Sequence, residues 1–293
     1  MLTIGAYDGL HRGHMSVITS VVNEAKARSA RSVVITFDRH PASVVRPESA
    51  PLLITSLEER IEVLAHAGLD AVVVLPFDES AARENAADFV QRVFVDALAA
   101  EVVIVGEDFH FGKGREGNVP MLHELGAVHD FVVSPIVLHR DDHDVISSTA
   151  IRQALRNGDI DRASSMLGRP VRVHGEVIHG DERGRTIGFP TANIDAGPGV
   201  AIPADGVYAA RCTVDGKAYR CAVNIGRRPT FYEAAGRSLI ECHLLDFDGD
   251  LYGRTLAIEI IGRLRDEQRF EGLSELTAQL ALDVEATRKL VEL

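Results

Sequence analysis

The chain has 293 residues, close to twice the ~150 that serves as a prior for one domain, so two domains are expected. With 46% hydrophobic and 25% charged residues, the composition is that of a globular protein and excludes a disordered or collagen-like chain. The 31 basic against 43 acidic residues give a net charge of −12, which argues against a general nucleic-acid binder. Any nucleotide site must therefore create local positive potential from helix N-termini, basic side chains or Mg²⁺.

Hydropathy and cysteine usage bear on location. No apolar run approaches the ~20 residues that cross a bilayer, and Met1 leads into a strand without a signal-peptide pattern. Cys212, Cys221 and Cys242 form no C-x-x-C pair and sit in strand-like apolar contexts. We expect a cytoplasmic protein, free of membrane contact, whose cysteines are reduced core residues.

The first half alternates short β-branched runs with helical patterns. Helical spacing joins Met15, Ile18, Val22 and Ala25; Ile61, Leu64 and Ala65; and, less regularly, Phe89, Val93 and Leu98. The strand candidates are Leu2 to Ala6, Val33 to Phe37, Ala71 to Leu75, Val102 to Gly106 and Phe131 to Ile136. This alternation predicts a doubly wound parallel sheet with helices on both faces.

After Gly168-Arg169-Pro170 strands follow one another. Asp215-Gly216 is a strong hairpin signal, and the strand candidates are Tyr208 to Val214, Ala218 to Asn224, Leu239 to Phe247 and Leu256 to Leu264. A closing helix has an apolar stripe of Leu273, Leu276, Leu280 and Val284. We expect a small antiparallel β-barrel or sandwich with a C-terminal helix, a boundary near residues 165 to 170, and domains of residues 1–165 and 169–293.

The segment TIGAYDGLHRGHMSVI joins the first strand to the first helix. It places Gly5, Gly9 and Gly13, with His11 and His14, at the carboxyl edge of a parallel sheet, where ligands bind. Glycines allow close approach to a phosphate, and a helix starting near His14 would offer N–H groups and a positive dipole end. The alternatives are a plain glycine-rich turn with surface histidines, or a zinc site, for which no third ligand is suggested nearby.

Four motifs in register carry a family resemblance. His11-Arg12-Gly13-His14 resembles the H-x-G-H signature of nucleotidyltransferases, within a longer run that includes Asp8. TFDRHP (36–41), VGEDFHFGKGREGN (105–118) and ISSTAIR (146–152) follow in order. Together they resemble the bacterial bifunctional riboflavin kinase/FMN adenylyltransferases, also called FAD synthetases. The resemblance implies His11 and His14 as catalytic residues, and Gly5, Asp8, Gly9 and Gly13 as nucleotide-binding residues.

The last two of these motifs also have physical interpretations. Asp108, Phe109 and Phe111 follow the fourth strand, where a carboxylate beside an apolar platform could hold a heteroaromatic ring; core aromatics with a capping aspartate are the alternative. In the other motif, Ser147, Ser148 and Thr149 precede a short helix as N-cap candidates, and Arg152 would project from its first turn. This predicts a second anion site, although capping alone would explain the hydroxyls.

A second glycine-rich segment lies between residues 173 and 194. Its glycines, Gly175, Gly180, Gly184 and Gly188, are spaced too widely for a P-loop, so a loop of another kind would hold phosphate. Thr191 and Asn193, two residues apart in an extended segment, could place hard oxygen ligands on one side of it for Mg²⁺ bound to a nucleotide. Taken alone, these are also common turn residues.

In LIECHLLDF, alternation places Ile240, Cys242 and Leu244 on one face of a strand and Glu241 with His243 on the other. A carboxylate on a rigid strand can act as a general base for a hydroxyl; by itself it is more often a solvated strand residue.

The second half resembles the riboflavin kinase module throughout. The matching segments are GFPTAN (188–193), GVYAA (206–210), VNIGRRPTF (223–231) and DFDGDLYG (246–253). The resemblance implies that Thr191 and Asn193 bind the Mg²⁺-nucleotide and that Glu241 is the catalytic base. It implies riboflavin, FMN and ATP as substrates and Mg²⁺ as cofactor.

The chain departs from the family pattern at three places. Tyr7 replaces the usual Phe, Ala150 stands where Arg is frequent, and the usual stretch before the first strand is missing. Two alternatives to the bifunctional enzyme remain. Ala150 and the missing stretch favour a kinase with weak or lost adenylyltransferase activity, and the rival from another class is a flavin- or nucleotide-sensing protein without turnover.

Overall fold

The computed structural model describes residues 1–136, 140–141, 144–180, 183–227 and 238–293. The chain forms two compact units, Met1–Ser148 and Thr149–Leu293. Helices α6 (Ser148–Asn157) and α7 (Ile160–Leu167) thus belong, apart from Ser148, to the second unit, upstream of the boundary expected near residues 165 to 170. Where each catalytic domain begins and ends stays a prediction. No helix among the described residues has both the length and the apolar character needed to cross a membrane.

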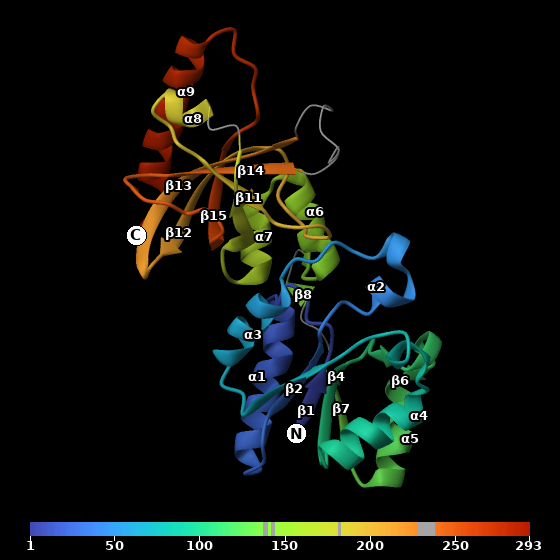
Figure 1. The fold of residues 1–293 in the computed structure, drawn as a ribbon. Helices are drawn as coiled ribbons and strands as arrows, with labels where there is room; N and C mark the ends of the chain where they lie inside the picture. Colours follow the sequence, from blue (N-terminus) through green and yellow to red (C-terminus); the bar gives the residue numbers. More distant parts are fainter. Residues whose placement is uncertain (137–139, 142–143, 181–182, 228–237) are drawn as a thin grey trace. The chain divides into compact units, whose positions relative to one another are not determined.

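A five-stranded parallel sheet forms the centre of the first unit, in the order β3-β2-β1-β4-β7 (blue to green in Figure 1). The predicted doubly wound sheet is confirmed. The chain winds outward from β1 to β3 and then crosses to β4 and β7, so β1 and β4 are adjacent where the winding reverses, the usual ligand-binding edge. The strands are β1 (Leu2–Ile4), β2 (Val33–Phe37), β3 (Ala71–Leu75), β4 (Val102–Gly106) and β7 (Val132–Ile136).

Helices cover both faces of this sheet. Val34 packs with Ile18 of α1 and Leu64 of α3, whereas the next residue, Ile35, belongs to the cluster that contains Phe94. The main helices are α1 (Arg12–Ala27), α3 (Leu57–Ala65), α4 (Ala86–Phe89) with its π-helical continuation Val90–Ala97, and α5 (Val119–His129). Shorter elements are α2 (Ala42–Val45), the 3-10 turns Pro47–Ser49, Ala81–Arg83 and Lys113–Arg115, and the strand pairs β5 (His110–Phe111) with β6 (Gly117–Asn118) and β8 (Arg140–Asp141) with β9 (Asp144–Val145).

The second unit is a closed antiparallel barrel in the order β10-β11-β14-β13-β12-β15. At the predicted hairpin, Asp215 and Gly216 have φ angles of 52° and 78°, the positive values that a tight two-residue turn requires. β10 was not among the predicted strands, and Gly175 lies within it rather than in a loop. The strands are β10 (Val171–Ile178), β11 (Ala192–Asp195), β12 (Gly206–Val214), β13 (Lys217–Arg227), β14 (Ser238–Leu244) and β15 (Thr255–Arg265).

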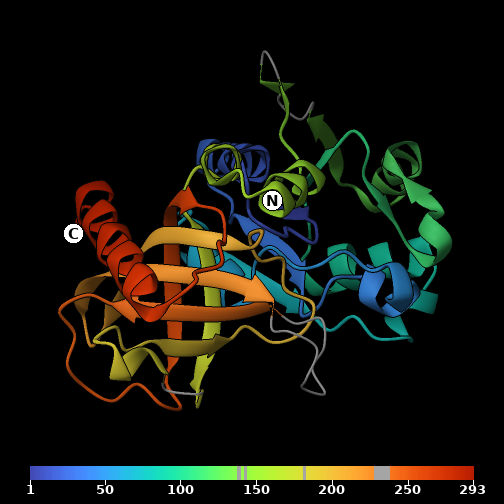
Figure 2. The same cartoon turned by 90° about the horizontal axis from the view of Figure 1, so that it is seen from above.

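The long helix α9 (Leu273–Leu290) lies beside the barrel (red in Figure 2), and α8 (Arg183–Thr186) is a single turn. The expected apolar stripe is partly wrong, because Leu273 is 62% exposed while the helix's buried positions are Asp283 and Thr287. Asp283 forms an ion pair with Arg265 at the end of β15, in which Nη2 of Arg265 lies 2.8 Å from Oδ2 of Asp283, and this pairing compensates for its burial. The helix is thus held by a partly buried ion pair as well as by apolar packing.

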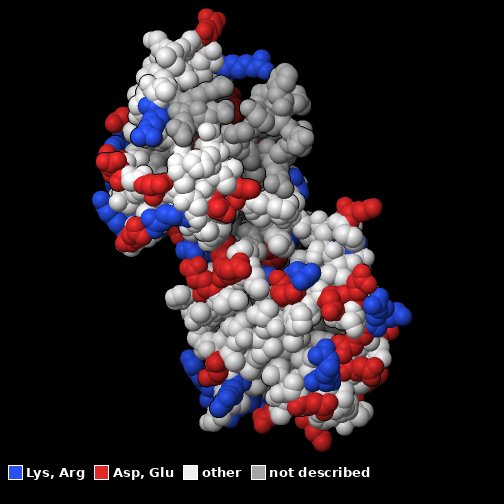
Figure 3. Space-filling model, viewed as in Figure 1, with Lys and Arg blue, Asp and Glu red and all other residues white. Residues whose placement is uncertain are grey.

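The three cysteines all point into the barrel. Cys212, Cys221 and Cys242 are buried and free, and Sγ of Cys221 donates a hydrogen bond to Sγ of Cys212 at 3.3 Å. This confirms the prediction of reduced core residues. On the face shown in Figure 3, acidic and basic side chains are interspersed over the described surface of both units.

Candidate active sites

A pocket lies at the carboxyl ends of β1 and β4 in the first unit. Its lining includes the predicted residues Gly5, Asp8, His14, Asp108 and Phe109, with Ser148 from the end of the unit. The first strand ends at Ile4, and the chain then turns sharply, with Tyr7 at φ 49° and Gly9 at φ 86°. At Gly9 an added Cβ would lie 3.2 Å from Ile54, so the loop backbone runs close to its neighbour.

The two histidines stand at the start of α1. His11 is the N-cap and its Nδ1 accepts the N–H of His14 at 3.3 Å, so the helix begins at Arg12 rather than near His14. The two imidazole rings stack with centroids 3.6 Å apart, and Tyr7 meets the His14 ring edge-on at 5.1 Å. Burial, together with the nearby His11, holds the pKa of His14 well below its usual range. His14 is therefore a neutral hydrogen-bonding group near pH 7.

Hydrogen bonds of Asp8 and Ser148 hold the glycine-rich loop in place. The Asp8 carboxylate is 3% exposed and accepts the backbone N–H groups of Ile54 and Thr55 at 3.0 and 3.1 Å. Ser148 donates its hydroxyl to the Asp8 carbonyl at 2.8 Å. Both residues line the pocket, and these bonds connect the glycine-rich loop to two distant segments of the unit.

The predicted aromatic platform is present at the end of β4. Asp108 is exposed, and Phe109 stacks on Phe111 with ring centroids 5.3 Å apart and planes 14° from parallel. Phe111 is 8% exposed and packs into the core, so Phe109 is the ring that lines the pocket. Thr149 and Arg152 belong to the second unit, where Thr149 is exposed and Arg152 is 9% exposed.

Two pocket or loop residues were missed by the sequence interpretation. His40, inside the TFDRHP motif, lines the pocket, and its Nδ1 accepts the N–H of Ala42 at 3.1 Å, which leaves the proton of the neutral ring on Nε2. Arg60 of α3 is 2% exposed and donates to the carbonyl of Ala6 at 2.8 Å. The motif could have identified His40; nothing in the local pattern singled out Arg60.

In the second unit, three neighbouring strands place polar residues on the outer face of the barrel. The register pairs Asn193 of β11 with Glu241 of β14, and Glu241 with Asn224 of β13. Ile240 and Cys242 are buried at 1% and 0%, while Glu241 is half-buried, which confirms the predicted alternation. The half-buried Thr191 immediately precedes β11. The Mg²⁺-binding candidates and the candidate base therefore lie in one row of adjacent strands.

The glycines of the second segment fall into distinct environments. A Cβ on Gly180 would overlap the amide of Asn193, and one on Gly184 would overlap the carbonyl of Phe189 and lie 3.5 Å from Oγ1 of Thr191. These two glycines therefore approach the candidate metal ligands directly. Gly188 has a φ of 85° in open space, and Gly175 packs against β11. Residues 181–182 of this segment and 228–231 of the VNIGRRPTF motif lie outside the described residues.

His243 holds the loop before β11. Its Nδ1 lies 2.7 Å from the carbonyl of Pro190, so it donates its proton there, and its ring meets Phe189 edge-on at 5.6 Å. The sequence placed His243 on the same face as Glu241 without assigning it a role. Its contact fixes the backbone that carries Thr191.

Comparison with known proteins finds a matching family for each part of the chain. A family model for FAD synthetase matches residues 1–150, and one for riboflavin kinase matches residues 167–291. The bifunctional riboflavin kinase/FMN adenylyltransferases of Escherichia coli (strain K12) and Bacillus subtilis (strain 168) are 40% and 36% identical, each over 97% of this chain and 90% of their own length. A solved structure from Streptococcus pneumoniae, named as a macrolide-efflux protein, is 31% identical with a TM-score of 0.86, covering 98% of this chain and 93% of its own. The chain belongs to the bifunctional riboflavin kinase/FMN adenylyltransferase family.

Proposed function

We propose that the two activities of this enzyme reside in separate units. The second unit phosphorylates riboflavin to FMN with ATP, and the first adenylylates FMN to FAD with a second ATP and releases pyrophosphate. The observation that carries this division is that each unit has its own row of polar residues, at the β1/β4 edge of the sheet and on the β11-β14-β13 face of the barrel.

In the kinase reaction Glu241 acts as the general base. Its carboxylate stands outward on a rigid strand and takes the proton of the ribityl 5′-hydroxyl as that oxygen forms a bond to the γ-phosphorus of ATP. The bond from the γ-phosphorus to ADP breaks, and ADP leaves. Positioning and charge stabilisation supply the rest of the catalysis.

The residues around Asn193 fit a magnesium-bound nucleotide. Thr191 and Asn193 offer oxygen ligands, and Mg²⁺ is typically held by few protein ligands together with substrate phosphates. Gly180 and Gly184 leave room for backbone beside these two side chains. Bound there, Mg²⁺ would neutralise phosphate charge, while Gly188 and the neighbouring loop accommodate the phosphates.

In the adenylyltransferase reaction the FMN phosphate attacks the α-phosphorus of ATP, and the bond to pyrophosphate breaks. His14 and His11 at the start of α1, with Gly5, Gly9 and Gly13, bind the phosphates. Asp108 and Phe109 hold a heteroaromatic ring, and Ser148 lines the same pocket. Neither reaction requires a covalent enzyme intermediate.

The partners of the enzyme are accordingly riboflavin, FMN and ATP, and we expect no nucleic-acid or membrane partner. The three free cysteines support a cytoplasmic location, where thiols stay reduced.

The proposed roles are tested by feeding two variants with different substrates. Glu241→Gln keeps the side-chain size but removes the basic carboxylate, so FMN formation should fall by ~10²-fold, within the range that general bases contribute. His14→Ala removes a preorganised phosphate donor, so FAD formation should fall by ~10²-fold. Each variant should retain the other activity, measured with supplied riboflavin or FMN. Parent rates in both assays would return both residues to structural roles.

A further inference from the structure

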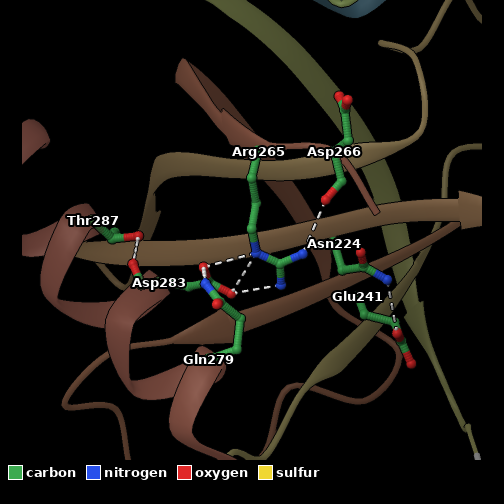
Figure 4. Close-up of polar contacts among 7 residues, drawn as sticks. All are labelled: Asn224, Glu241, Arg265, Asp266, Gln279, Asp283 and Thr287. Carbon is green, nitrogen blue, oxygen red and sulfur yellow. Dashed lines mark hydrogen bonds and ion pairs between the residues drawn. The ribbon is translucent and has the colours of Figure 1, made fainter. Parts of the chain in front are cut away.

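Asn224 lies beside the candidate base without a role so far. It stands on β13 directly opposite Glu241 of β14, and its neighbours Val223 and Ile225 point into the barrel at 0% exposure. Its amide Nδ2 donates to Oε2 of Glu241 at 3.4 Å (Figure 4). Hydrogen bonds in unliganded active sites are often long and tighten when substrate binds.

A second carboxylate lies near the Asn224 amide. The Asn224 side chain favours the ionised form of Glu267, two residues beyond the end of β15, and so lowers its pKa. Partial burial and the neighbouring charges of Asp205 and Glu241 raise the pKa of Glu267, in keeping with carboxylates that lie close together. Ionised carboxylates only accept hydrogen bonds, so the NH₂ group of Asn224 faces Glu241. The nearby Glu267 carboxylate favours the same orientation of the amide.

The contacts of Arg265 hold the segment that leads to Glu267 in place. Arg265 makes a two-atom contact with Asp283 of α9, from Nε to Oδ1 at 3.0 Å and from Nη2 to Oδ2 at 2.8 Å, and its Nη1 donates to the carbonyl of Asp266 at 3.0 Å (Figure 4). Gly226 of β13 has no Cβ, and Glu267 fills the space where one would stand. The helix α9 thus fixes the turn that presents Glu267 to Asn224.

We propose that Asn224 is a positioning residue of the kinase site, which holds Oε2 of Glu241 so that Oε1 faces the substrate hydroxyl, with Glu267 orienting the Asn224 amide. The proposal rests on the role of Glu241 as base. The proton passes from the ribityl hydroxyl to Oε1 as the oxygen bonds to the γ-phosphorus and ADP departs. Asn224 itself exchanges no proton and contacts no reacting atom.

The test is a double-mutant cycle on riboflavin phosphorylation by the full chain. Asn224→Leu keeps the side-chain size and removes the donor, so kcat should fall about tenfold, as expected for loss of one hydrogen bond to a charged group, with both KM values within about twofold of the parent. Glu241→Gln should be slower still. Because Asn224 acts through Glu241, the double variant should be no slower than Glu241→Gln alone.

Three further variants complete the cycle. Asn224→Ser keeps a donor and should recover part of the loss, and Glu267→Gln should cost about threefold, since only the orientation of Asn224 is affected. Lys217→Leu, at the hairpin end of the same strand, should phosphorylate riboflavin at the parent rate. FMN-fed FAD formation and the melting temperature report whether each variant is folded.

The outcomes separate the two hypotheses. If Asn224→Leu keeps the parent kcat while Glu241→Gln is impaired, the Asn224 role is overturned and the base assignment stands. If the two losses multiply in the double variant, Asn224 acts independently of Glu241 and the positioning role is wrong. If Glu241→Gln itself keeps the parent rate, the base assignment fails, and the Asn224 proposal fails with it.

Discussion

At the scale of single residues, imidazole rings fix backbone segments in both units. Nδ1 of His11 accepts the N–H of His14, Nδ1 of His40 accepts that of Ala42, and Nδ1 of His243 donates to Pro190. In each case the bond at Nδ1 determines whether the other ring nitrogen, Nε2, carries a proton in the neutral ring. The two rings of the first unit that cap backbone this way therefore hold their remaining proton on Nε2 when neutral.

His40→Ala should weaken FAD formation. A hydrogen bond to a charged phosphate contributes about 1.5–3 kcal/mol, so we expect roughly a tenfold loss or more in FMN adenylylation, with riboflavin phosphorylation unchanged. His66→Ala is the matched control, because His66 is exposed at the C-cap of α3 and its Nδ1 bonds the carbonyl of Glu62. Adenylylation at the parent rate in His40→Ala would show that this ring only shapes the loop.

The sequence identified Glu241 but not its neighbours. Alternation along one strand is enough to place Glu241 opposite in direction to Ile240 and Cys242, and the structure agrees. Asn224 and His243 acquire their roles from the register between strands and from a contact across to Pro190. Register depends on the whole barrel, so local pattern could not reveal these contacts.

At the scale of elements, the parallel strands were the best predicted. Val33–Phe37, Ala71–Leu75 and Val102–Gly106 match the predicted ranges, because parallel strands read as short continuous β-branched runs. The irregular spacing from Phe89 to Leu98 corresponds to the π-helical turns of Val90–Ala97, which shift the buried positions. β10 was missed because Gly175 interrupts the apolar face formed by Val171, Val173 and Val177.

The ion pair between Arg265 and Asp283 should be a main support of α9. The two side chains are 19% and 5% exposed, so Asp283→Ala leaves an arginine largely buried without its partner and should lower the free energy of unfolding by about 3 kcal/mol. Asp246→Ala removes another ion pair to α9, the one between Asp246 and Arg288. These two side chains are 68% and 38% exposed, so this substitution should lower the free energy of unfolding much less. Urea unfolding, monitored by the loss of kinase activity, compares the two variants. Equal losses of unfolding free energy would contradict the role of the Arg265–Asp283 pair as a main support of α9.

The helices before the barrel should stabilise the kinase unit. The carbonyl of Leu155 accepts the N–H of Ala204 at 2.9 Å. Gly158 packs against Arg263 so closely that a Cβ added at Gly158 would lie 3.0 Å from the guanidinium. A fragment of residues 149–293 should therefore melt at a higher temperature than one of residues 169–293. Both should convert riboflavin to FMN and make no FAD; FAD formation by either fragment would contradict the division of activities.

At the scale of the whole molecule, two units with separate cores carry two consecutive reactions. Length predicted two domains, and the change from alternating elements to successive strands predicted their classes, which the parallel sheet and the closed barrel confirm. The expected boundary followed that change of pattern, whereas α6 and α7 cluster with the barrel through contacts that no local pattern encodes.

A single time course tests the central claim most directly. Purified full-length protein is incubated with riboflavin, ATP and Mg²⁺, and the flavins are separated by chromatography at successive times. Two activities in one chain predict that FMN rises first and then falls as FAD accumulates. Accumulation of FMN without FAD would mean that the chain has lost adenylylation, and the absence of both products would contradict the enzyme assignment.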